Sequence, residues 1–138
     1  MQQILIVAGA AAIALVVGWL MQRRKPDVPS TPIHHVMPSQ LDRDDFVRPE
    51  SPWLVAVFTS ETCATCAKVW QAAELVEADD VAVQNVEVGR DGQLHERYGI
   101  TAVPGVVIVD AAGVCQASFL GPPTAADLWA KLAELREP

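Results

Sequence analysis

Two cysteines, Cys63 and Cys66, are separated by two residues within the stretch TSETCATCAKV, residues 59–69. Such a pair can form a reversible disulfide, supply half of a metal site, or consist of two small residues that fall close together by chance. An apolar, β-rich segment precedes the pair and a helical pattern follows it. The elements around the pair therefore decide which interpretation holds.

The apolar segment WLVAVFTS, residues 53–60, predicts a strand that is buried on both faces, as a central parallel strand is. Helical spacing follows from Ala64, with an apolar face made by Cys66, Val69, Ala73 and Val76. Cys63 is thus expected at or before the first helical turn, where free N–H groups and the helix dipole favour a negative charge. Because the thiolate is the reactive form of cysteine, Cys63 is the natural attacking thiol and Cys66, one turn deeper, the resolving thiol.

Five further elements are predicted from hydrophobic pattern and turn residues. They are strands over 81–88, 105–110 and 114–121, a short helix over 93–99, and a last helix over 124–136 that Thr124 caps. A short helix capped by Ser39 is expected over 39–47, and a strand near 35–36 is a further option. Trp53, Trp70 and Trp129 are expected in the core. The order β-α-β-α-β-β-α predicts an α/β sandwich with a mixed sheet.

The N-terminal segment predicts a membrane anchor. Residues 4–21 are almost wholly apolar, no side chain before Arg23 is charged, and about 20 such residues cross a ~30 Å hydrocarbon core. A cleaved signal peptide is the alternative, but the residues that follow the apolar segment make a poor cleavage site. Arg23, Arg24 and Lys25 come next, so the positive-inside rule predicts a single-pass protein whose soluble part is cytoplasmic.

Three parts of the chain are expected on this basis: a transmembrane anchor over 1–22, a basic and then proline-rich linker over 23–38, and a folded domain over 39–138. The folded part has seven Lys and Arg against sixteen Asp and Glu, a formal charge of −9. This charge argues against nucleic acid as a partner and is compatible with basic partners. The linker's adjacent His34 and His35 lack the further ligands that a metal site needs.

Two motifs with their context carry a family resemblance. Cys63-Ala64-Thr65-Cys66 follows a buried strand, and Tyr98-Gly99-Ile100-Thr101-Ala102-Val103-Pro104 precedes another one. Gly113 in a predicted turn and Gly121 after the last strand agree with the same pattern. Over about residues 40–136 the chain resembles the thioredoxin family. The resemblance implies a thioredoxin-like three-layer sandwich, a cis Val103–Pro104 bond, and a substrate groove that includes Thr62, Val103 and Pro104.

The chain also departs from the family pattern, in which the motif is usually Trp-Cys-Gly-Pro-Cys. Thr62 replaces the tryptophan, and Ala64-Thr65 replaces Gly-Pro, so the redox potential cannot be carried over and a less reducing value is expected. Val57 and Asn85 stand where thioredoxins carry a buried Asp and a Lys. A buried Val cannot accept a proton, so water, Glu61 or the Thr65 hydroxyl would have to assist Cys66. Slower or narrower redox chemistry is expected.

The sequence therefore predicts an enzyme, a membrane-tethered thiol–disulfide oxidoreductase that reduces protein or small-molecule disulfides. It needs no metal or organic cofactor, and a reductase or a low-molecular-weight thiol supplies electrons. An outward-facing domain, similar to the anchored thioredoxin-like proteins of cytochrome c maturation, is one alternative. A sulfur (persulfide) carrier and a non-catalytic binding module at the membrane are two others. Cys115 is expected as a small buried residue of the last strand, with a third redox or sulfur-carrying thiol as the alternative.

Overall fold

The computed structural model describes Met1 and residues 37–137. The elements in chain order are η1 (Arg43–Asp45), β1 (Trp53–Thr59), α2 (Cys66–Glu74), β2 (Val81–Glu87), α3 (Gly92–Arg97), β3 (Gly105–Val109), β4 (Cys115–Leu120) and α4 (Ala125–Arg136). From β1 onward this is the predicted order, and each predicted strand and helix is present with slightly shorter bounds.

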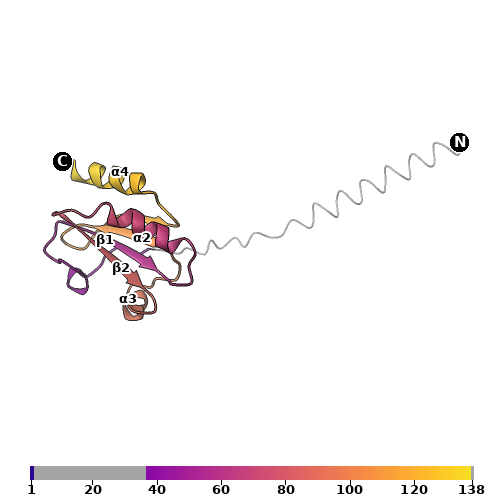
Figure 1. Cartoon of the computed structure of the whole chain (residues 1–138), viewed down its shortest axis with the longest axis horizontal. Helices are drawn as coiled ribbons and strands as arrows, with labels where there is room; N and C mark the ends of the chain where they lie inside the picture. The colour runs from indigo at the N-terminus through magenta and orange to yellow at the C-terminus, as the bar shows by residue number, and fades with distance from the viewer. Residues whose placement is uncertain (2–36, 138) are drawn as a thin grey trace. The chain divides into compact units, whose positions relative to one another are not determined.

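One mixed sheet organises the domain, with strand order β2-β1-β3-β4. Strand β1 pairs in parallel with β2 and antiparallel with β3, so it is central, as its apolar sequence predicts. Helices α2 and α4 cover one face of the sheet and α3 lies on the other (Figure 1). The predicted three-layer α/β sandwich with a mixed sheet is confirmed.

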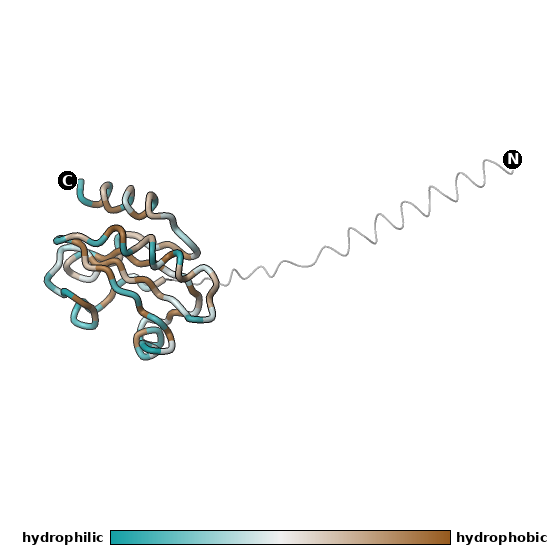
Figure 2. The backbone as a smooth tube through the Cα atoms, in the orientation of Figure 1, coloured by the Kyte–Doolittle hydropathy of each residue, from teal (hydrophilic) through white to brown (hydrophobic). Residues whose placement is uncertain are grey.

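Alternation along β1 divides the core into two clusters. Val55 and Val57 pack with residues of α2 and α4, whereas Leu54, Ala56 and Phe58 pack with residues around α3. Hydrophobic residues accordingly concentrate along the strands of the sheet (Figure 2). Strand β1 has no solvent-facing side, so apolar residues are favoured at every position, and its sequence is a continuous apolar segment.

The helix predicted over 39–47 is wrong, because only a three-residue 3-10 turn forms there, at Arg43–Asp45, and Asp42 rather than Ser39 caps it. The backbone before this turn is already paired with the β3–β4 hairpin. Cys115 N donates to Ser39 O at 2.9 Å, and Gln40 forms a bridge with Val114. Groups engaged across the sheet are not free for the i to i−4 bonds of a helix.

The first described residues of the domain extend along β3. Met37 packs against the cluster on the α3 side, and a β-carbon on Gly105 would lie 2.7 Å from Met37 Cε. At the other end of β3, Leu41 N donates to the carbonyl of Gly113, which has a φ of +79°. Residues 37–41 thus connect the start of β3 to the turn that follows it.

The tryptophan prediction holds for two of the three residues. Trp53 and Trp70 are half-buried against the cluster on the α2 and α4 side. Trp129 is 45% exposed, so its expected core position is wrong. Helix α4 packs on the core through Leu128 and Leu132, and Trp129 lies on its solvent-exposed side.

No helix within residues 37–137 is long and apolar enough to cross a membrane. The predicted anchor over 1–22, most of the linker over 23–38, and the optional strand near 35–36 lie outside the described residues. These predictions, and the cytoplasmic orientation that depends on them, stay predictions.

Candidate functional site

A disulfide joins Cys63 and Cys66, whose Cα atoms are 5.4 Å apart. Cys63 belongs to the loop between the end of β1 and the start of α2, and Cys66 is the first residue of α2. Cys66 is only 4% exposed, whereas Cys63 is half-buried. An external sulfur therefore reaches Cys63 more readily than Cys66. The division into attacking and resolving thiols stays a prediction.

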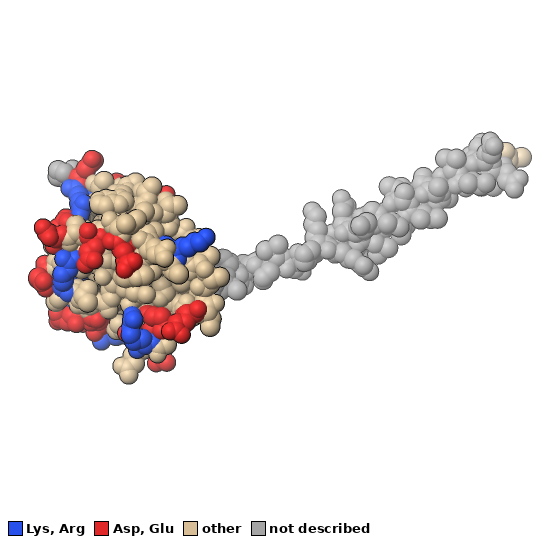
Figure 3. Space-filling view, viewed as in Figure 1, with Lys and Arg blue, Asp and Glu red and all other residues tan. Residues whose placement is uncertain are grey.

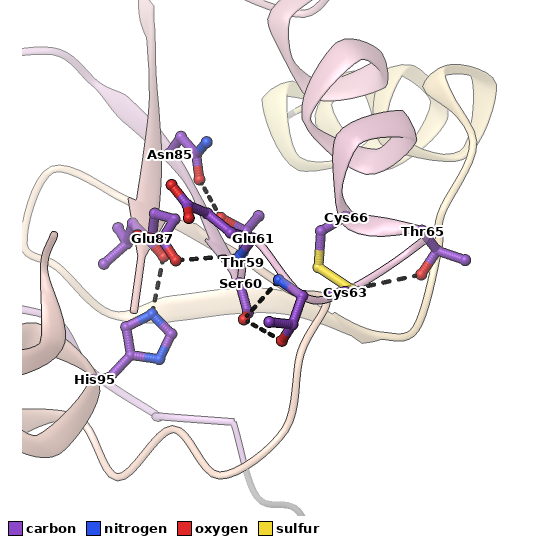
Figure 4. The surroundings of a disulfide bond; sticks show 11 residues. Thr59, Ser60, Glu61, Cys63, Thr65, Cys66, Asn85, Glu87 and His95 are labelled. Atoms are coloured by element: carbon purple, nitrogen blue, oxygen red, sulfur yellow. Dashed lines mark hydrogen bonds between the residues drawn. A yellow bond between two sulfur atoms is a disulfide. The ribbon is translucent and has the colours of Figure 1, made fainter. Parts of the chain in front are cut away.

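The N-terminus of α2 supplies a favourable field for a sulfur anion. Thr65 is the N-cap residue of α2, and no acidic residue occupies the first turn. Within α2 itself, no carboxylate therefore offsets the positive end of the helix dipole, although Glu61 and Glu87 line the cavity beside the cysteines. The Thr65 hydroxyl lies 3.8 Å from Cys63 Sγ, within hydrogen-bond range for sulfur (Figure 4). Its side chain makes no cap bond to the helix backbone, so the hydroxyl is available to the sulfur.

The predicted groove residues lie at the same end of the sheet as the disulfide. The Val103–Pro104 peptide bond is cis. The next residue, Gly105, pairs with Phe58 near the carboxyl end of β1, and the loop to the disulfide starts just beyond. Pro104 is buried, Val103 is half-buried, and Thr62 is exposed beside Cys63. Their part in substrate binding stays a prediction.

A neutral polar pair stands beside the resolving cysteine. Val57 is fully buried and pairs in register with Asn85. The buried Thr59 hydroxyl donates to Asn85 Oδ1 at 2.6 Å (Figure 4). Both Thr59 and Asn85 line a cavity of about 250 Å³ whose wall also includes the two cysteines. The cavity is open to solvent and Thr59 and Asn85 supply polar groups in its wall, so it has room for water that could accept a proton from Cys66.

Glu87 ties the disulfide loop to the turn after β2. Its Oε1 accepts a hydrogen bond from Glu61 N at 3.2 Å, and its Oε2 accepts one from Arg90 N at 3.0 Å. The pKa of Glu87 lies below its ordinary value, first because the Gly89 backbone N–H donates to it and then because Arg90 and Glu61 do. Hydrogen bonds to a carboxylate favour its charged form, so Glu87 is an anion at neutral pH.

Three residues of this site were not predicted in functional positions. Thr59, Glu87 and Trp70 all line the cavity beside the disulfide. Thr59 ends β1 and Glu87 ends the parallel neighbour β2, and the carboxyl ends of parallel strands meet at one edge of a sheet. A polar residue at the end of each strand was the available signal. Trp70 was expected only to fill the core.

The third cysteine lies away from the disulfide. Cys115 begins β4 and pairs with Val109, at the end of β3 opposite to Pro104. Its Sγ donates to Ala117 O at 3.3 Å, and burial raises the pKa of the Cys115 thiol. A half-buried thiol held in its neutral form is poorly reactive. Packing is therefore the role that this position supports.

Solved structures share this fold. A mutant thioredoxin from Halobacterium salinarum NRC-1 is 24% identical with a TM-score of 0.60, over 74% of this chain and 89% of that one. A thioredoxin from Fasciola hepatica is 21% identical with a TM-score of 0.53, over 61% and 81%. Deadhead, a germline-specific thioredoxin from Drosophila melanogaster, is 21% identical with a TM-score of 0.54, over 63% and 84%.

The chain thus has the thioredoxin-like fold that the sequence predicts. No protein-family model matches it, and a comparison with curated protein sequences finds no match. At these identities the solved structures establish the fold, and the chemistry has to be argued from the CxxC pair and its surroundings.

Proposed function

We propose that this protein is a thiol–disulfide oxidoreductase that acts mainly as a reductase of protein or small-molecule disulfides. One observation carries the proposal: a disulfide links an accessible Cys63 to a buried Cys66 at the N-terminus of α2. The fold, the cis Val103–Pro104 bond at the same end of the sheet, and the Thr65 hydroxyl near the sulfur support it. No metal or organic cofactor takes part in this chemistry.

In the proposed cycle, the Cys63 thiolate attacks one sulfur of a substrate disulfide and the substrate's other sulfur leaves as a thiolate. Cys66, having lost its proton to water in the cavity, attacks Cys63 Sγ in the resulting mixed disulfide. The substrate's second sulfur leaves, so the substrate gains two electrons and the Cys63–Cys66 disulfide forms. A reductase or a low-molecular-weight thiol returns the two electrons.

The reduction potential of the full chain in neutral detergent, measured against defined thiol buffers, tests the proposal. A reversible two-electron couple near or below about −250 mV is expected for a reductase that works against a cytosolic thiol pool. A value near about −180 mV or above would indicate an oxidant, an isomerase or an outward-facing role. A pair that forms no reversible disulfide would refute the redox function and favour a sulfur carrier or a binding module.

Three variants assign the roles of the cysteines. Cys63→Ser is expected to abolish disulfide reduction, because the accessible nucleophile is lost. Cys66→Ser is expected to accumulate the mixed disulfide with substrate, because the resolving step is lost. Cys115→Ser is the matched control and is expected to reduce substrates at the unaltered rate, since this thiol lies at the opposite end of β3.

The tether is a second part of the proposal and rests on the sequence. Residues 1–22 would anchor the chain, and Arg23, Arg24 and Lys25 would keep the domain on the cytoplasmic side. A tether raises the effective concentration of the enzyme toward clients at the membrane. Labelling of reduced Cys63 in intact cells with a membrane-impermeant reagent tests the orientation. Labelling without permeabilisation would place the domain outside.

A further inference from the structure

The cavity beside the disulfide has a negative wall. Among the described residues that line it, Glu61 and Glu87 are the charged ones, and no Lys, Arg or His takes part. Two basic residues are close in sequence to lining residues: Lys68 lies in α2, and Arg90 lies in the turn after β2. The guanidinium of Arg90 is 2.7 Å from Asp91 Oδ2. That contact offsets most of the positive charge that Arg90 would otherwise contribute. A ligand that approaches the sulfurs along this wall therefore meets two carboxylates.

The rest of the wall also suits a positively charged group. Trp70 supplies an aromatic surface, and among aromatic side chains an indole interacts most favourably with a cation. Asn85 and Thr59 add neutral polar groups rather than a competing charge. Beyond the cavity, acidic side chains are spread over the face of the domain that Figure 3 shows, in keeping with the formal charge of −9 on residues 39–138. The long-range field thus has the same sign as the wall.

Both cysteines line this cavity, so a group bound in it lies next to the reacting sulfurs. We propose that the cavity binds the cationic group of a thiol or disulfide substrate and so makes the CxxC pair selective for positively charged partners. The shared chemistry is an ammonium or guanidinium close to a sulfur. It can come from a small aminothiol or from a basic residue beside a disulfide in a peptide. This inference rests on the proposed oxidoreductase function and specifies its substrate class.

A small aminothiol RSH reduces the Cys63–Cys66 disulfide in two steps. Its thiolate attacks Cys63 Sγ, the Cys63–Cys66 bond breaks, and the electron pair leaves with Cys66 Sγ, which takes up a proton. A second thiolate attacks the substrate sulfur of the mixed disulfide, and Cys63 leaves as a thiolate. Two thiols are oxidised to RSSR and the protein disulfide is reduced. The wall carboxylates act by holding the ammonium near the point of attack.

The test measures second-order rate constants for reduction of the disulfide in the full chain, kept in neutral detergent at low ionic strength. The probes are cysteamine, 2-mercaptoethanol and 3-mercaptopropionate, which are cationic, neutral and anionic, with rates corrected for thiolate concentration and thiol basicity. Attraction by one carboxylate at about 6 Å in water is worth about threefold in rate. Cysteamine is therefore expected to react at least about fivefold faster than 3-mercaptopropionate. Added salt at about 1 M should largely remove the difference.

A matched pair of variants assigns the preference to the cavity. Glu61→Gln removes one wall charge and is expected to lower the rate preference for cysteamine over neutral 2-mercaptoethanol about threefold. Glu96→Gln removes an exposed charge on α3 that does not line the cavity, so it is expected to leave the preference unchanged. An equal loss in the two variants would overturn the assignment of the preference to this cavity.

A peptide arm separates the two sources of the cation. The reduced chain is oxidised by two disulfide-linked peptides that differ only in a Lys or a Glu beside the cysteine. A preference for the Lys peptide alone identifies basic protein segments as the substrates, and a preference for cysteamine alone identifies small aminothiols. Absence of both preferences refutes the inference while the disulfide still turns over. A pair that reacts with none of the probes would refute the proposed function itself.

Discussion

The Thr65 hydroxyl offers a quantitative test of how the loop activates Cys63. It lies 3.8 Å from Cys63 Sγ in the disulfide form, where the sulfur is neutral. In the reduced form the same hydroxyl can donate to the thiolate. Because Thr65 is exposed and the contact is long, we assign this bond about 1 kcal/mol, below the range of about 1.5–3 kcal/mol for charged acceptors. Thr65→Val should then raise the midpoint of the Cys63 thiolate titration by about 0.7 pH unit.

The kinetic consequence changes sign with pH. Well below the midpoint, Thr65→Val lowers the thiolate fraction about fivefold, and the greater basicity of the remaining thiolate restores about twofold. The net alkylation rate should fall about 2.5-fold there and rise about twofold above the midpoint. The assay is iodoacetamide alkylation across pH in a Cys66→Ser, Cys115→Ser background, which leaves one thiol. Thr65→Ser keeps the hydroxyl and serves as the control. An unshifted midpoint in Thr65→Val would show that the hydroxyl does not stabilise the thiolate.

Three further predictions concern the frame around the site. Gly113→Ala should cost about 2–4 kcal/mol of unfolding free energy in denaturant titrations, because φ is +79° and the new β-carbon would lie 1.9 Å from Leu41 O. Arg43→Met should cost about 2–4 kcal/mol, because its buried guanidinium donates to three backbone carbonyls, and a midpoint equal to that of the unaltered chain would contradict this. Glu87→Ala should speed hydrogen exchange of the Glu61 amide. The pKa of Glu87 in the folded chain is lowered, so the hydrogen bond from Glu61 N to its carboxylate is fully present above the ordinary pKa of a glutamate. This bond is lost as pH falls through the lowered pKa. In acid, exchange of the Glu61 amide in the unaltered chain should therefore approach that of the variant.

The parts of the fold that local pattern determines were predictable. The apolar segment of β1, the buried face of α2, and the Thr124 cap of α4, which forms a capping box with Asp127, all follow from residues close in sequence. The two cysteines were brought together for the same reason, since a strand-to-helix junction with this spacing fixes their separation.

Features that depend on distant partners were not predictable in the same way. Residues 39–41 pair with the β3–β4 hairpin, and no pattern in these three residues predicts that pairing. The cavity is lined in part by Thr59 and Asn85, which come from two strands and meet only after the sheet forms. The prediction that Trp129 lies in the core was wrong, because a single aromatic residue does not define which side of a helix faces the core.

The position of Met37 has a mechanical consequence. Its side chain lies against Gly105, directly after Pro104, so the chain enters the domain at the same end of the sheet as the disulfide loop. Any force transmitted through residues 1–36 acts on the reactive end of the domain rather than on the opposite end. If residues 1–22 anchor the chain as proposed, the linker is attached at the end of the domain that carries the sulfurs, and they stay near this attachment point however the domain rotates. The length of the linker would then set how far from that point a client's disulfide can be reached, without any change in the domain itself.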